Sequence, residues 1–249
     1  FNSNVSMNTV LRWPDYQYEY GQGTGRALNT AGEKYYSYGT SADGGSTSGT
    51  SSAFGPRFNG QQYFQYDPNV EGQSATRLPW VAQPNNIKGF WRTGSTITNN
   101  ISLESGNENG SVRASLTHSK NEWIMPNTGF ERMTAALSVS QKVSEKLKFV
   151  AKVNYTNKSS DNLPATGYNN QSIAYFMIFQ NPNVDLSWYR PIWKKGQEQV
   201  DQVHPFSSFI DNPYLIAYEM TNGVKSNAFL ANMAATYTIN KKFDLMLRS

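Results

Sequence analysis

Few residues of this chain have the types and spacing that catalysis or metal binding requires. The 249 residues contain no cysteine and two histidines, His118 and His204, neither of which lies in an HExxH or similar metal-binding spacing. The carboxylates are dispersed along the chain, so their spacing does not indicate a pair suited to glycoside hydrolysis. The sequence therefore predicts no enzyme activity, no metal site and no cofactor.

Three aromatic residues are better suited to binding. Trp188, Tyr189 and Trp193 cluster in a long segment between two predicted strands. Exposed aromatic rings can stack on sugar rings or accommodate peptide side chains, which makes these three residues candidate substrate contacts. The alternative is that they pack together in the core of the segment that carries them, because large aromatic side chains also dominate core packing.

The elements that must position these residues are β-strands, because apolar and polar residues alternate with period two. The clearest segment covers residues 147–156, and a second covers residues 229–239. Shorter or less regular patterns occur at residues 1–7, 96–103, 112–117, 135–140 and 243–247. The sequence therefore predicts about seven strands, several of them near the 9 to 11 residues that a tilted strand needs to cross a bilayer.

The connections between the predicted strands alternate in length. Long or medium connections at residues 11–94, 119–129 and 158–224 alternate with tight turns at residues 106–110, 144–146 and 240–242. Short turns at one end and long loops at the other are typical of outer-membrane β-barrels. Residues 37–55, rich in Gly, Ser and Thr, are predicted to be mobile, and residues 168–180 are predicted to form a short helix or a buried strand.

The composition agrees with a β-barrel, and it argues against a helical membrane protein and against a nucleic-acid-binding protein. Only 38% of residues are hydrophobic while 14% are aromatic, and the apolar run at residues 173–179 is too short for a membrane helix. The formal net charge is +4, but the basic residues do not cluster, so we expect no nucleic-acid partner. In a barrel, the alternation places Phe149, Ala151, Val153, Met233 and Ala235 toward lipid. It places Arg113, Lys148, Lys152, Asn154 and Thr236 toward the lumen.

Several blocks of sequence resemble the SusC/RagA-type TonB-dependent transporters, which import glycans or peptides across the Gram-negative outer membrane. They lie in the family's order and span nearly the whole chain. The blocks are YEYGQGTG (18–25), FGPRFNGQ (54–61), NNIKGFWRTGSTITNNISLESGNENGSVRASLTH (85–118), IMPNTGFER (124–132), AKVNYTNKSSDNLP (151–164), GYNNQSIAYFMIFQNPNVDLSW (167–188) and DNPYLIAYEMTN (211–222).

This resemblance implies that residues 1–249 are the N-terminal portion of a transmembrane antiparallel β-barrel of 22 strands with long extracellular loops. The plug domain and the later strands would not be in this sequence. The implied function is TonB-dependent import of an oligosaccharide or oligopeptide, with a SusD-like surface lipoprotein as a lid and the TonB complex as the periplasmic partner. The alternatives are a surface carbohydrate-binding β-protein without transport and an outer-membrane barrel enzyme.

Overall fold

The structure is a computed structural model that describes residues 1–249 apart from 24–26, 29–33, 36–50, 170–171 and 205–209. It is mostly β, and its main element is a seven-stranded antiparallel sheet. The strands, in sheet order, are β1 (Asn2–Asn8), β8 (Gly94–Asn107), β9 (Gly110–Glu122), β10 (Gly129–Lys142), β11 (Leu147–Ser160), β12 (Val224–Asn240) and β13 (Phe243–Arg248). The prediction of about seven strands is confirmed. The sheet is open, with β1 and β13 as its edges in the part of the chain that the structure describes.

Side-chain oxygens accept backbone hydrogen bonds at each of the three tight turns. Asn107 Oδ1 accepts from the backbone nitrogens of Asn109 (2.9 Å) and Gly110 (3.1 Å) between β8 and β9. Ser144 Oγ accepts from the Leu147 nitrogen (3.1 Å) between β10 and β11, and Asn240 Oδ1 from the Lys242 nitrogen (2.9 Å) between β12 and β13. These local bonds close a turn without help from distant residues, so the sequence could predict all three turns.

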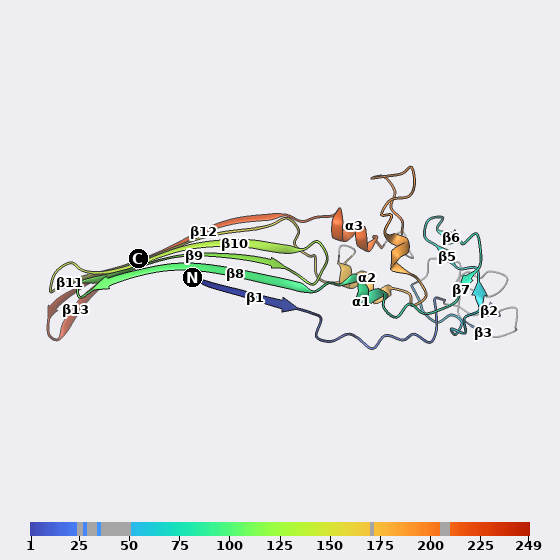
Figure 1. Cartoon of the computed structure of the whole chain (residues 1–249), viewed down its shortest axis with the longest axis horizontal. Helices are drawn as coiled ribbons and strands as arrows, with labels where there is room; N and C mark the ends of the chain where they lie inside the picture. Colours follow the sequence, from blue (N-terminus) through green and yellow to red (C-terminus); the bar gives the residue numbers. More distant parts are fainter. Residues whose placement is uncertain (24–26, 29–33, 36–50, 170–171, 205–209) are drawn as a thin grey trace.

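The three tight turns lie at one end of the curved sheet and all longer connections lie at the other (Figure 1). The longer connections are residues 9–93, 123–128 and 161–223. The predicted alternation of short and long connections is therefore confirmed. We call the described parts of residues 9–93 and 161–223 the loop cap.

The loop cap contains the helices and the short strand pairs. Its elements are β2 (Ala27–Leu28), β3 (Lys34–Tyr35), β4 (Gln62–Tyr63), β5 (Tyr66–Asp67), β6 (Gly72–Gln73), β7 (Leu78–Pro79), α1 (Asn86–Phe90), α2 (Ile173–Phe179), the 3-10 helix η1 (Leu186–Tyr189) and α3 (Pro213–Tyr218). Residues 168–180 thus contain a short helix, which begins after Ser172, whose side chain accepts a hydrogen bond from the Tyr175 nitrogen. Within the described residues, no helix combines the length and apolar character needed to span a membrane. Most of residues 37–55, predicted to be mobile, lie outside the described residues.

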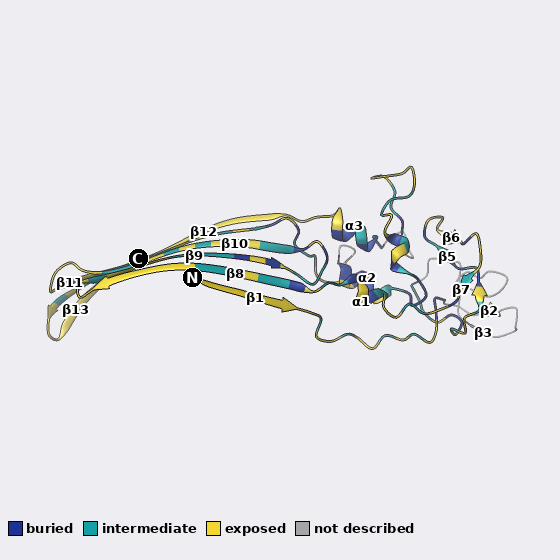
Figure 2. Cartoon of the chain, in the orientation of Figure 1, coloured by how far each residue is buried: buried dark blue, intermediate teal, exposed yellow. Residues whose placement is uncertain are grey.

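The buried apolar core lies in the loop cap and not in the sheet (Figure 2). A cluster built from α1, α2, η1 and α3 includes Phe176 and Tyr189, which are both fully buried, and Trp13, Trp91 and Trp188 pack against it. Trp80 is also fully buried and lies near the rings of Phe58 and Tyr63. The loop cap is therefore a folded unit with its own core.

Candidate functional site

The sheet has an apolar face whose residues come from every strand. Residues opposite each other across a ladder share a face, so the pairing register defines rows across the sheet. One row runs Leu103, Ala114, Leu137, Val153 and Ala231. The rows on either side contain Ile101, Leu116, Ala135, Tyr155 and Phe229, and Ser105, Val112, Val139, Ala151 and Met233. The alternation in the sequence thus becomes one continuous apolar band.

Nothing in the described structure packs on this apolar face. The helices lie beyond one end of the sheet (Figure 1), and several apolar side chains of the strands are strongly exposed. Leu103 is 72% exposed, Phe229 67% and Leu247 69%. A soluble monomer rarely leaves so large a contiguous apolar surface in water. The band therefore requires an apolar environment that the loop cap does not supply.

The opposite face is polar and carries all five residues predicted to face the lumen, namely Arg113, Lys148, Lys152, Asn154 and Thr236. Arg113 and Lys152 lie in one row that runs Glu104, Arg113, Ser138, Lys152 and Asn232. Lys148 lies opposite Lys142 and Thr236, and Asn154 lies opposite Ala136 and Leu230. The structure thus places Arg113, Lys148, Lys152 and Asn154 together on one exposed surface.

Neutral polar side chains on this face bond to one another near the loop cap. Asn100 Nδ2 donates to Thr117 Oγ1 (2.7 Å) and Asn121 Nδ2 donates to Thr96 Oγ1 (2.6 Å). The hydroxyl oxygens of Thr98 and Ser119 lie 3.1 Å apart, and those of Thr134 and Thr156 lie 3.3 Å apart. The polar face is therefore lined by hydroxyl and amide groups as well as by charged ones.

The structure separates the three aromatic residues that the sequence grouped as candidate substrate contacts. Tyr189 is fully buried, and its ring meets Phe176 edge-on at 6.3 Å between centroids. Burial raises the pKa of the Tyr189 phenol well above its ordinary value, because the ionised form would lose its hydration. Tyr189 therefore packs in the loop-cap core and presents no side-chain surface to a ligand, which corrects the expectation for this residue.

Trp188 and Trp193 keep part of their surface accessible. Trp188 is half-buried against the loop-cap core, and Trp193 is half-buried in an isolated antiparallel bridge with Gln202. The segments that carry them are held by Asn212, which is fully buried. Its side-chain nitrogen donates to the carbonyl oxygens of Tyr189 (2.9 Å) and Val203 (3.0 Å), while its side-chain oxygen caps α3. These bonds give Trp188 and Trp193 a defined backbone support.

An ion-pair cluster joins the two long excursions of the loop cap. Lys194 Nζ lies 2.9 Å from Glu71 Oε1 and 2.8 Å from Asp201 Oδ2. Hydrogen bonds to Asp201 and Glu71 raise the pKa of Lys194, because both carboxylates favour its charged form. The cluster lies directly after Trp193 and adds to the order of that part of the loop cap.

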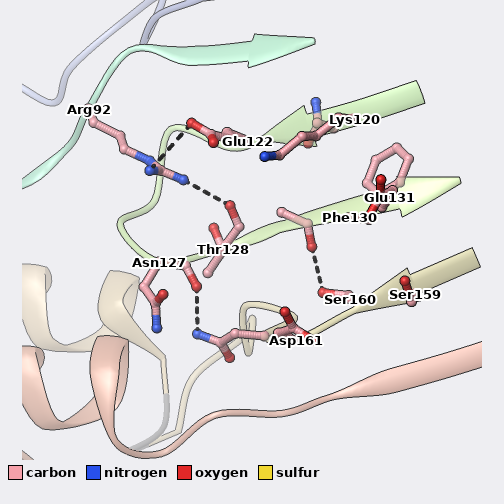
Figure 3. A pocket seen from close by; sticks show the side chains of 13 residues that line it. Arg92, Lys120, Glu122, Asn127, Thr128, Phe130, Glu131, Ser159, Ser160 and Asp161 are labelled. Carbon is pink, nitrogen blue, oxygen red and sulfur yellow. Dashed lines mark hydrogen bonds and ion pairs between the residues drawn. The ribbon is translucent and has the colours of Figure 1, made fainter. Parts of the chain in front are cut away.

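A polar cavity of about 340 Å³ lies where the sheet meets the loop cap (Figure 3). We call it the rim cavity. The Arg92 guanidinium borders it, donating to the carbonyl oxygens of Trp123 (2.9 Å) and Thr128 (3.0 Å) and lying 3.8 Å from a Glu122 carboxylate oxygen. On the other side Asn162 Nδ2 donates to the Asn127 carbonyl (3.0 Å). Sequence reasoning missed this cavity, since its lining comes from four separate segments that no local pattern connects.

Each of the two histidines has a ring nitrogen close to an oxygen atom of the protein. His118 Nε2 lies 2.6 Å from a carboxylate oxygen of Glu131 on the neighbouring strand, near the loop cap. His204 Nδ1 lies 3.4 Å from the Ile210 carbonyl oxygen. Among the residues that the structure describes, no group of three or more His, Cys, Asp or Glu side chains could hold a metal ion.

Comparison with known proteins does not assign this chain to a family. No protein-family model matches the chain, and no curated protein matches it.

Proposed function

We propose that the seven-stranded sheet is an arc of a transmembrane β-barrel in a Gram-negative outer membrane. The observation that carries this proposal is the single-layer sheet itself, with one apolar face exposed and one polar face. Lipid outside and water inside would satisfy both faces, as they do in outer-membrane barrels. A soluble carbohydrate-binding sheet would instead need a packing layer over the apolar band, and the described elements supply none.

The lengths of the strands and the positions of their aromatic side chains support a membrane environment for the sheet. Strands β8, β10 and β11 have 14 residues each, more than the 9 to 11 that a tilted strand needs to cross the hydrocarbon core. On the apolar face, Tyr155 and Phe229 lie opposite each other on the loop-cap side of the band, while Phe149 and Tyr237 lie toward the tight turns. Aromatic residues at both borders of an apolar band are typical of the two membrane interfaces.

The unpaired edge strands of the sheet support the proposal that the complete protein forms a closed barrel. Strands β1 and β13 each pair on one side only in the described structure, which leaves a row of backbone donors and acceptors unpaired on the other. Lipid cannot bond such groups, so only a closed barrel is compatible with the membrane. Further strands of the complete barrel would pair with both edges.

Within this barrel class we propose a SusC/RagA-type TonB-dependent importer of an oligomeric nutrient. Support comes from the sequence blocks that resemble this family and from the loop cap, whose folded core can present Trp188 and Trp193 to cargo. A SusD-like lipoprotein would close over the loop cap from outside. The TonB complex would act from the periplasmic side, through segments that are not in this sequence.

Cysteine labelling tests the membrane placement, because residues 1–249 contain no native cysteine, and any cysteine elsewhere in the complete transporter is first replaced by serine. In the complete transporter in outer membranes, we expect Lys152→Cys to react with a water-soluble maleimide. The neighbouring Val153→Cys, on the opposite face, should react only with a lipid-soluble maleimide. The two positions differ by one residue along β11, so strand location and expression are matched. Equal reaction of both cysteines with the water-soluble reagent would refute the lipid-facing assignment.

Single-cysteine variants also test, in intact cells, which end of the sheet faces the cell exterior. An impermeant maleimide should label Lys195→Cys in the loop cap and should leave Glu145→Cys, in a tight turn, unlabelled until the outer membrane is opened. Labelling in the reverse order would place the loop cap in the periplasm and exclude cargo capture at this end.

Replacement of Trp188 or Trp193 by alanine tests cargo contact. If either ring meets cargo, the alanine variant should bind with an affinity weaker by about 1 to 3 kcal/mol, the scale of burying one large aromatic surface. The measurement is calorimetry on the complete transporter with its lipoprotein partner, comparing equally folded samples. Unchanged affinity in both variants would assign the two rings to loop packing alone.

A further inference from the structure

The apolar face of the sheet becomes polar at its loop-cap end. Beyond the row that contains Tyr155 and Phe229, the next row toward the loop cap runs Asn99, His118, Met133, Asn157 and Asn227. The row after it runs Ile97, Lys120, Glu131, Ser159 and Lys225. We call these two rows the outer collar, since the pairing register places them on the same face as the apolar band.

Charge on this face is confined to the loop-cap end of the strands. The strand residues of the face that carry a carboxylate, ammonium or imidazole group all lie in the outer collar or in the row next to it, and they are His118, Lys120, Glu122, Glu131 and Lys225. Toward the tight turns, the same strands place only uncharged residues on this face, including Phe149, Tyr237 and Phe243. The two ends of the apolar face therefore offer different chemistry to their surroundings.

The two acidic residues of this set have partners within the chain, whereas the two lysines have none there. Glu131 Oε1 lies 2.6 Å from His118 Nε2, and a Glu122 carboxylate oxygen lies 3.8 Å from the Arg92 guanidinium. Both lysines are exposed, and neither forms an ion pair with a described residue. They lie in one row three strands apart, which is roughly 14 Å at the usual spacing of neighbouring strands. Their ammonium groups are therefore available to an anion outside the chain.

Neutral groups and a recess complete the outer collar. Asn227 Oδ1 accepts hydrogen bonds from the Tyr155 hydroxyl (2.8 Å) and from Asn157 Nδ2 (2.8 Å), which fixes the amide and leaves its nitrogen to donate outward. Three consecutive members of the second row also line the rim cavity of about 340 Å³, namely Lys120, Glu131 and Ser159. Amide donors, ammonium groups and a recess together suit a phosphorylated sugar.

We propose that the outer collar binds the phosphorylated headgroup of a glycolipid in the outer leaflet of the membrane. The inference rests on the proposed barrel and names the lipid that meets it at the cell exterior. The outer collar follows the aromatic border along the same strands, so it lies at the level of the headgroups. This face points away from the lumen, so cargo inside the barrel does not reach the two lysines. Confinement of charge to one end agrees with two leaflets of different chemistry, and the amide and hydroxyl groups between the lysines favour a sugar over a simple phospholipid.

The test is lipid binding by the complete transporter in detergent, measured by native mass spectrometry. The probes are lipid A with its phosphate groups, the same lipid A after enzymatic removal of phosphate, and phosphatidylglycerol. We expect phosphorylated lipid A to bind most tightly. Lys120→Gln and Lys225→Gln should each weaken its binding about two- to five-fold, the range of an exposed ion pair. The double variant should weaken it further and should show a smaller preference for the phosphorylated form.

Lys158→Gln is the matched control, because it removes the same charge at the same end of β11 but on the polar face. It should bind lipid A as the unmodified protein does. Equal binding of the two forms of lipid A, no effect of the double variant, or an equal effect of Lys158→Gln would overturn the inference. Tighter binding of phosphatidylglycerol than of lipid A would overturn the glycolipid assignment. Each of these outcomes leaves the barrel proposal intact, which fails instead if Val153→Cys and Lys152→Cys label alike.

Discussion

Replacing Val153 by arginine should destabilise the folded transporter by about 2 to 4 kcal/mol, the cost of a cation on the lipid face near the bilayer midplane. Val153 lies near the middle of β11 in the continuous apolar row with Leu137 and Ala231. The measurement is denaturant unfolding of the complete transporter in lipid vesicles, followed by tryptophan fluorescence.

The control for this prediction is Asn154→Arg, one residue further along the same strand. Asn154 lies on the polar face opposite Ala136 and Leu230, with no cation directly across either ladder. An arginine there would remain in water, so we expect a stability change within about 0.5 kcal/mol, as for other surface substitutions. A larger loss for Asn154→Arg than for Val153→Arg would mean that the faces are reversed and would refute the barrel as proposed.

The strands and tight turns were predictable because the information for them is local. Alternation over a few residues decides which side chains of a strand share a face, and the side chains of Asn107, Ser144 and Asn240 close their own turns. The row that joins Arg113 to Lys152 needed one further step. The tight turn between β10 and β11 sets the register that pairs Ser138 with Lys152, but β9 and β10 are joined by the longer connection 123–128, so the pairing of Arg113 with Ser138 does not follow from a turn position.

The loop cap was less predictable because its contacts are not local. The fully buried Asn212 bonds residues 9 and 23 positions away, and Lys194 Nζ meets Glu71 from 123 positions away. No periodicity reports such contacts. The sequence could therefore place Tyr189 in an aromatic cluster, but it could not show that Tyr189 alone of the three residues has a fully buried side chain. The rim cavity was missed for the same reason.

Replacing Phe176 by alanine should unfold or loosen the loop cap while the strands stay paired. Phe176 is fully buried in α2 and packs edge-on against Tyr189, so its truncation leaves a cavity that typically costs about 3 to 5 kcal/mol. The small helices of the loop cap have few residues and cannot persist without this packing. We expect amide hydrogen exchange in α2 and α3 to accelerate while exchange in β10 and β11 stays slow.

Ile178→Ala is the matched control on the same short helix. Ile178 is 63% exposed, so its truncation removes little buried surface and should leave exchange in α3 unchanged. If Phe176→Ala accelerates exchange in the strands as much as in the helices, the loop cap and the sheet unfold as one unit. If neither variant changes exchange, the buried cluster does not hold the loop cap together. Only selective loosening by Phe176→Ala agrees with a loop cap that is stabilised by its own core, separately from the sheet that carries it.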